Sequence, residues 1–128
     1  MNLLLDTHVA LWAITDSPRL SSEARRLVAS EQTTVFVSVA SLWEITIKHA
    51  LGRGDMPISG QEAMGYFRAS GYRLLAIAPE HAIAVADLPP HHYDPFDRMI
   101  VAQALVEPLR LVTHDAKVQL YSPTFMGI

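Results

Sequence analysis

Carboxylate side chains are the residues of this sequence whose type and placement could perform chemistry. Four of them are of interest, namely Asp6 in "LLLDTH", Glu44 in "SLWEITIK", Asp97 in "DPFDRM" and Asp115 in "LVTHDAK". Taken singly, each has an ordinary structural explanation, because acidic residues are common at helix starts and in ion pairs along helices. If they gather at one place, they need a cation or raised pKa values, because neighbouring like charges disfavour joint ionisation.

The available ligand types indicate which cation such a cluster would hold. The chain contains no cysteine, which excludes disulfides and thiolate ligands. Carboxylate oxygens without clustered histidine favour Mg²⁺ or Mn²⁺. A divalent cation held in this way suits phosphoryl chemistry. The sequence has neither a P-loop nor a GxGxxG motif to hold a nucleotide, so a phosphodiester is a better candidate substrate than ATP.

The structural alternatives for these acids remain open on the sequence alone. Asp6 and Asp115 could each be the cap of a following helix. Glu44 could close a capping box with Ser41, or form an exposed ion pair with Lys48 four residues later. A cap at Ser38 would instead place Glu44 about two turns into its helix.

The stretch "HHYDPFDRM" places two aspartates at one helix start. Asp94 is best explained as the cap, because Pro95 then occupies the first helical position, which proline favours. This arrangement points Asp97 inward. We assign Asp97 to the candidate cluster because only its position is matched by three other acids that the parallel strands and helices are expected to bring to the same sheet edge. The positive end of the helix dipole would help to keep Asp97 ionised there.

The elements that position these acids follow from the hydrophobic pattern. Four short apolar runs predict strands at residues 2–6, 33–38, 72–78 and 109–113, and each is followed by a helical pattern. The alternation predicts an α/β fold in which a short central parallel sheet of four to five strands is covered by helices on both faces. Ligands of such sheets bind beyond the carboxyl ends of the strands, which is where Asp6 and Asp115 are expected.

Composition narrows the class of protein further. We expect one domain spanning residues 1–128. Ten basic and thirteen acidic residues give a net charge of 10 − 13 = −3, which argues against a broad basic surface that coats nucleic acid. No apolar run approaches the roughly 18 residues that would span a bilayer, and the start has no basic leader. We expect a cytoplasmic protein.

Four motifs in order carry a resemblance to a known family. With "LLLDTHVALW", "VSVASLWEITIK", "DPFDRMIVAQA" and "LVTHDAKVQLY", nearly the whole chain resembles the PIN-domain ribonucleases, specifically the VapC-like toxins of bacterial type II toxin–antitoxin systems. The resemblance implies a three-layer PIN-like fold and a Mg²⁺-dependent endoribonuclease, with Mn²⁺ able to substitute, that hydrolyses RNA through a metal-activated water. It also implies a homodimer that is neutralised by a cognate antitoxin in a larger complex, with the antitoxin's C-terminal segment covering the cleft.

Site residues carry over by position from this family. Asp6, Glu44 and Asp97 match its three core acidic metal ligands, and Asp115 matches its more variable fourth. His114 stands where relatives commonly have a basic residue, which leaves the role of Asp115 open.

Several other residues have both a functional and a structural interpretation. Thr7 and Thr113 could hydrogen-bond to the ligating carboxylates or cap the following turns. Candidate RNA contacts are Lys48, Arg53 and Arg98; a solvated helix face is the alternative for the first two, and a structural salt bridge is favoured for Arg98. The spacing of three histidines matches no zinc pattern, so we expect them at the surface or in packing: His8, His91 and His92. We expect both tryptophans, Trp12 and Trp43, in the core or in a dimer interface.

Two other functions are compatible with the acidic constellation. The first is a phosphatase that uses Asp6 as nucleophile, as strand-end aspartates do in haloacid-dehalogenase-like proteins, although His8 stands where those proteins need a second acid. The second is a non-catalytic module whose acidic cleft docks a basic partner peptide. Metal binding and a trapped phospho-aspartate distinguish these possibilities.

Overall fold

The computed structural model describes all residues from 1 to 128 and contains one five-stranded sheet. All neighbouring strands are parallel, in the order β3-β2-β1-β4-β5. The strands are β1 (Asn2–Leu5), β2 (Thr34–Ser38), β3 (Arg73–Leu75), β4 (Arg110–Thr113) and β5 (Met126–Gly127). The predicted α/β fold with a parallel sheet is confirmed.

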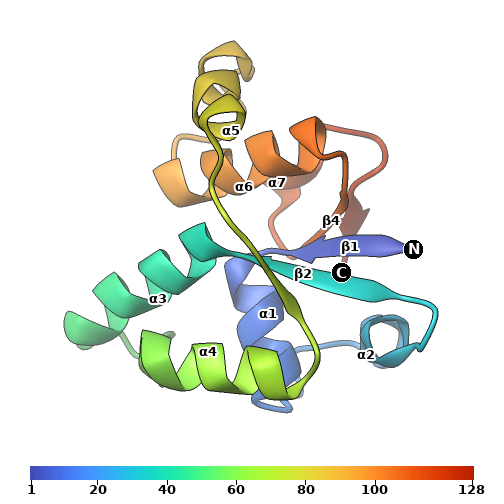
Figure 1. The fold of residues 1–128 in the computed structure, drawn as a ribbon, viewed down its shortest axis with the longest axis vertical. Coiled ribbons are helices and arrows are strands. Elements are labelled where there is room, and N and C mark those ends of the chain that lie inside the picture. The colour runs from blue at the N-terminus through green and yellow to red at the C-terminus, as the bar shows by residue number, and fades with distance from the viewer.

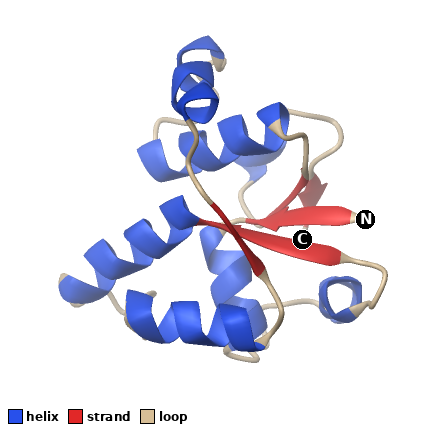
Figure 2. Ribbon diagram, viewed as in Figure 1, coloured by secondary structure: helices blue, strands red, loops and turns tan.

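Helices cover both faces of this sheet (Figures 1 and 2). One side carries α1 (Thr7–Ile14), α2 (Ser22–Ala29) and α4 (Gly60–Ala69), and the other carries α6 (Pro95–Val106) and α7 (Ala116–Gln119). The long helix α3 (Val39–Ala50) leaves the end of β2, and the short α5 (Pro79–Ala84) packs on α6 and runs into a 3₁₀ turn, Val85–Asp87. No helix has the length and apolar character needed to cross a lipid bilayer.

The central strand β1 shows why both faces must be covered. Its residues Leu3, Leu4 and Leu5 are completely buried. Successive side chains of a strand point to opposite faces, so Leu3 and Leu5 join the core under α1, α2 and α4, whereas Leu4 joins the core under α6 and α7. The apolar run in the sequence is therefore the signature of a strand buried on both sides.

Local signals in the sequence set most element boundaries. Ser21 caps α2, Ser59 and Glu62 form the predicted capping box of α4, and Asp94 caps α6 with Pro95 at the first helical position. The cap of α3 is Ser38, whose Oγ accepts a hydrogen bond from the Ala40 N–H; the alternative capping box from Ser41 is wrong.

The third strand is shorter than its apolar run predicts. The run predicts a strand at residues 72–78, but β3 covers only Arg73–Leu75. The strand lies at the edge of the sheet and pairs only with β2, so its last residues have no second neighbour and lead instead into the start of α5. The two-residue strand β5 is not among the four strands that the apolar runs predict.

Candidate functional site

All four acidic candidates line one hollow of about 580 Å³. It lies where β1 and β4 end and α1, α3, α6 and α7 approach one another. Three of the acids lie at or near helix starts, and Glu44 lies inside α3. The parallel sheet therefore gathers residues that are far apart in the sequence at the edge where such folds bind ligands.

Asp6 is both a helix cap and part of the acidic wall. Its Oδ1 accepts a hydrogen bond from the Val9 N–H at 2.9 Å, which caps α1. Its Oδ2 accepts from the Thr113 hydroxyl at 2.5 Å and from the His114 N–H at 3.3 Å. Burial raises the pKa of Asp6, and the hydrogen bonds from Thr113 and the two N–H groups oppose that rise.

Glu44 reaches the hollow from the second turn of α3. Its carboxylate is buried, with the residue only 3% exposed. The Thr7 hydroxyl donates to Oε1 at 2.6 Å, and the Lys48 ammonium lies 2.5 Å from Oε2. The Lys48 pair expected from the spacing is present, but it is not the exposed pair that the sequence suggested, because Glu44 is enclosed.

Asp97 differs from the other three acids in having no hydrogen bond to its carboxylate. Its backbone N–H donates to the Asp94 side chain as part of the α6 cap, and the nearest charged partner of its Oδ2 is His92 Nε2 at 3.3 Å. Burial and the charges of Asp94 and Glu44 raise the pKa of Asp97 to about 7. An incompletely solvated carboxylate without a donor is suited to bind a cation.

Asp115 is held by two donors at the start of α7. Its Oδ1 accepts from the Lys117 N–H at 2.8 Å, and its Oδ2 lies 2.8 Å from His92 Nε2. Burial acts to raise the pKa of Asp115, but the hydrogen bonds from His92 and Lys117 outweigh it, and the pKa is lowered. Its side chain is 38% exposed, so Asp115 is more accessible than either Asp6 or Asp97.

His92 belongs to this site, and the expectation that it is an ordinary surface or packing histidine is wrong. Its ring nitrogen lies between the carboxylates of Asp97 and Asp115. Potential ligand atoms of these three residues lie within 4.8 Å of one another. The sequence held no spacing signal for His92, because its contact with Asp115 joins residues 23 positions apart.

The basic candidates separate into two groups. Lys48 and Arg53 line the hollow, and so does Arg19, which the sequence did not single out. Arg98 does not line it and pairs with no acid, so the favoured salt bridge is wrong. Its guanidinium instead donates to backbone carbonyls of the preceding loop and to the Tyr121 hydroxyl, the carbonyls being those of Val85, Pro89 and His92.

Of the two tryptophans, only Trp12 belongs to the wall of this hollow, together with His8 and His114. Trp12 is buried and lines the hollow, with its ring 5.1 Å from that of His114. Trp43 is not in the core, because it is 59% exposed on α3. His8 also lines the hollow, and its Nε2 lies 3.2 Å from Oδ2 of Asp55, which is an acid of the hollow that the sequence did not single out.

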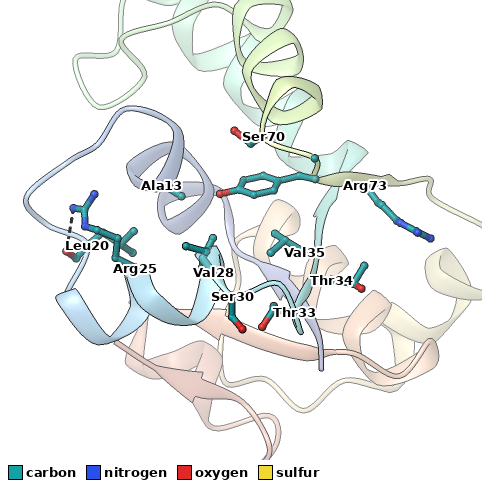
Figure 3. A pocket seen from close by; sticks show the side chains of 13 residues that line it. Ala13, Leu20, Arg25, Val28, Ser30, Thr33, Thr34, Val35, Ser70 and Arg73 are labelled. Carbon is teal, nitrogen blue, oxygen red and sulfur yellow. Dashed lines mark hydrogen bonds between the residues drawn. The ribbon is translucent and has the colours of Figure 1, made fainter.

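A second hollow of about 460 Å³ lies away from the acids (Figure 3). It is formed between α2 and the beginnings of β2 and β3, where Figure 3 places Val28, Thr34 and Arg73 around it. No acidic residue lines this hollow. The four acidic candidates therefore line the first hollow and not this one.

The residues of the first hollow fit a hard divalent cation. The donor set consists of carboxylate oxygens, two of the carboxylates are buried, and the Asp97 carboxylate accepts no hydrogen bond from the protein. Mg²⁺ and Mn²⁺ prefer such oxygen ligands. A bound cation would offset both the burial and the neighbouring negative charges that raise the pKa of Asp97.

Several solved structures have the same fold as this chain. The chain is similar to VapBC2 from Rickettsia felis bound to a promoter DNA fragment, with 19% identity, a TM-score of 0.72 and coverage of 100% of this chain and 98% of that chain. It is also similar to VapBC-1 from nontypeable Haemophilus influenzae and to DNA-bound VapBC from Salmonella typhimurium, with 16% and 18% identity; both have a TM-score of 0.66 and coverage of 100% and 97%.

Comparisons with sequences are consistent with that fold. No curated protein sequence matches the chain. The family model of the PIN domain matches residues 3–122, which includes all four acids of the hollow. PIN domains are generally nucleases, a class of enzyme that suits an acidic site built for a cation. The chain belongs to the PIN domain family.

Proposed function

We propose that this PIN domain is a Mg²⁺-dependent endoribonuclease that acts as the toxin of a VapC-like toxin–antitoxin pair. The observation that carries the proposal is the meeting of Asp6, Glu44, Asp97 and Asp115 around one hollow in which Asp97 lacks a donor. When bound, the cation would lower the pKa of an attacking water and neutralise charge that develops on the phosphate.

The protein's own residues would hold this acidic wall in shape. Thr113 donates to Asp6, and Thr7 donates to Glu44, so each hydroxyl fixes one carboxylate oxygen and leaves the group oriented. Removing a hydrogen bond of this kind to a metal ligand typically lowers metal affinity or activity by about 10- to 100-fold. We assign Thr7 and Thr113 this orienting role.

The rim of the hollow supports a phosphodiester substrate, and the likeness to the VapC-type toxins makes RNA the class that we propose. Lys48, Arg53 and Arg19 line the same hollow as the acids, so a phosphodiester backbone could lie against them while one phosphate reaches the carboxylates. The overall charge of −3 restricts binding to this local strip. Arg98 is less suited to RNA contact, because backbone carbonyls already accept from its guanidinium.

Cleavage by an Asp97→Asn variant tests the proposal. Asparagine preserves the size of the side chain but binds Mg²⁺ poorly, so we expect cleavage of a single-stranded RNA to fall at least about 100-fold with the fold retained. The matched control is Asp87→Asn, the same change at an exposed aspartate outside the hollow, which should cleave as the wild type does. Wild-type cleavage by Asp97→Asn would contradict the ligand assignment.

Of the two alternatives, the phosphatase is not favoured by the residues around Asp6. Haloacid-dehalogenase-like proteins need a second acid two residues after the nucleophile, and His8 stands at that place after Asp6. The non-catalytic module predicts no heat of Mg²⁺ or Mn²⁺ binding in calorimetry of the purified protein. Measurable binding that Asp97→Asn abolishes would exclude that module in its simple form.

An antitoxin and a second copy of this chain are the proposed protein partners. The solved structures similar to this chain include VapBC assemblies, which supports an antitoxin. For the homodimer, α3 offers an apolar stripe that this chain leaves exposed, made of Val39, Trp43, Ile47 and Leu51. The stripe follows four-residue spacing along one helix face and carries no charge, so two copies could pack it against itself.

A further inference from the structure

His92 is the one basic side chain placed between two of the four acids. Its Nε2 lies 2.8 Å from Asp115 Oδ2 and 3.3 Å from Asp97 Oδ2, and the side chain is only 16% exposed. This position permits two roles. The imidazole could bind a metal together with the two carboxylates, or it could donate a hydrogen bond that holds the carboxylates in place.

The second ring nitrogen of His92 distinguishes these roles. The backbone N–H of Asp94 donates to Nδ1 at 3.0 Å, so Nδ1 must carry a lone pair and no hydrogen. In a neutral imidazole the hydrogen then resides on Nε2, which faces the carboxylates. A metal ligand needs the reverse arrangement, because the coordinating nitrogen must be free of hydrogen, and the hydrogen on Nδ1 would then oppose the Asp94 N–H.

The loop that carries His92 is fixed from both sides. The Tyr121 hydroxyl accepts a hydrogen bond from the His92 backbone N–H at 2.9 Å, and Arg98 Nη1 donates to the His92 carbonyl at 3.1 Å. Arg98 and Tyr121 are also within hydrogen-bond distance of each other, at 3.3 Å. The ring thus has little freedom to turn, and the role of Arg98 is explained by this support of the loop.

From this geometry we propose that His92 is a positioning residue, which as a hydrogen-bond donor through Nε2 fixes the carboxylate of Asp115 beside that of Asp97 and is not itself a metal ligand. The inference rests on the proposed function in so far as these acids hold the metal. In this proposal the orientation of the Asp115 carboxylate depends on His92. The cation would then be held by oxygen atoms alone, which suits a hard cation.

The hydrogen position can be tested directly in the metal-free protein. Long-range ¹H–¹⁵N correlation spectra of ¹⁵N-histidine-labelled protein near pH 7.5 report which ring nitrogen bears the hydrogen, and His92→Gln identifies the signal. We expect Nε2–H with a bare Nδ1, and the same pattern after saturation with Mg²⁺. A bare Nε2 in either state would overturn the proposal.

Variants test the consequence for metal affinity. His92→Leu removes the donor, and calorimetry should show Mg²⁺ binding weakened about 10- to 100-fold. His92→Gln can donate from its amide to Asp115 and should recover most of the affinity. His91→Leu, the same change at an exposed neighbour outside the hollow, is the control and should bind Mg²⁺ as the wild type does.

Outcomes of these variants separate the two roles. With RNA as substrate, we expect His92→Leu to lower kcat with little change in KM, because the basic rim is untouched. Equal loss of Mg²⁺ affinity in His92→Leu and His92→Gln would identify the imidazole as a ligand and overturn the proposal. Wild-type affinity in His92→Leu would overturn it as well. If His92→Leu fails to fold in a thermal melt, His92→Gln and the spectra still decide.

The two proposals can fail separately. The spectra and the calorimetry use no RNA, so they test His92 whether or not the protein cleaves RNA. If the hydrogen lies on Nε2 and affinity responds as expected while the wild type leaves RNA intact, the nuclease proposal is wrong and the positioning role stands. If the wild type cleaves RNA but Nε2 is bare, the positioning role alone is wrong.

Discussion

At the scale of single residues, the four acids differ in how the protein satisfies them. Asp6, Glu44 and Asp115 each accept hydrogen bonds or an ion pair from neighbouring groups, whereas the Asp97 carboxylate has none shorter than its 3.3 Å approach to His92. Its burial among other acids raises its pKa to about 7. The cost of ionising Asp97 is therefore a property of the folded state that can be measured.

This raised pKa predicts how the stability of the metal-free protein depends on pH. Between about pH 4 and pH 7 the unfolded chain ionises Asp97 while the folded chain keeps it protonated, so the contribution of Asp97 to the free energy of unfolding is lost as pH rises through about 7. At pH 8 we expect Asp97→Asn to be more stable than the wild type by about 1 to 3 kcal/mol. Urea denaturation at pH 4.5 and pH 8 measures this, and an equal difference at both pH values would contradict it.

Mg²⁺ should reverse that penalty. A ligand that binds only the folded state at 100 times its Kd stabilises it by about 2.7 kcal/mol. We therefore expect saturating Mg²⁺ to raise the Tm of the wild type and to leave Asp97→Asn nearly unchanged. Asp87→Asn is the control and should respond as the wild type does. An equal rise in Tm for all three proteins would show that Mg²⁺ binds elsewhere.

At the scale of secondary structure elements, helix starts serve both folding and the site. Asp6 caps α1 and Asp115 caps α7, and both carboxylates also face the hollow. At α6 the two tasks are divided, because Asp94 accepts from the Phe96 and Asp97 N–H groups and leaves the Asp97 side chain uncommitted. The sequence presents capping and site formation as alternative roles for an aspartate, but in the structure Asp6 and Asp115 have both roles.

The division of tasks at α6 predicts contrasting effects of two changes at Asp94. Asp94→Ala removes the acceptor of the Phe96 and Asp97 N–H groups and should lower the free energy of unfolding by about 1 kcal/mol. Asp94→Asn retains a capping oxygen and should cost only a few tenths of a kcal/mol. Chemical denaturation of the metal-free proteins measures both. Equal destabilisation by the two changes would mean that the charge of Asp94 matters more than the cap.

At the scale of the whole molecule, the exposed stripe of α3 lies on a different side of the helix from the site. Glu44 and Lys48 reach the hollow, whereas Trp43, Ile47 and Leu51 remain exposed. One helix thus lines the acidic hollow on one side and exposes an apolar row on another, which is the surface of the proposed homodimer. A single exposed apolar residue needs no explanation, but an aligned row is typical of an interface.

A change of one residue tests the proposed homodimer. Ile47→Glu places a charge in the middle of the α3 stripe and should shift the protein from dimer to monomer, because charge is disfavoured in the core of an interface. The matched control is Ile83→Glu, the same change at an exposed isoleucine on α5. Sedimentation velocity measures the masses. A monomeric wild type, or a dimer that withstands Ile47→Glu, would contradict the assignment.

The amino-acid sequence by itself determined the parallel sheet, most helix starts and four of the acids that line the first hollow. Each of these depends on local signals: the run Leu3–Leu5 needs apolar cover on both faces, and Asp94 with Pro95 can begin a helix without distant help. Strand ends then bring Asp6 and Asp115 to one edge by a general rule of such sheets.

Tertiary structure alone decided the surroundings of those acids. The contact of His92 with Asp115 and that of Arg98 with three carbonyls depend on how the loop before α6 packs against Tyr121, and no local spacing encodes that packing. The pKa of Asp97 is likewise raised first by burial, which only packing provides, and the charge of Glu44, 53 residues away in the chain, adds to that of the nearby Asp94. Local preferences specify which groups are present, whereas long-range packing sets their distances and burial, and these determine their charge.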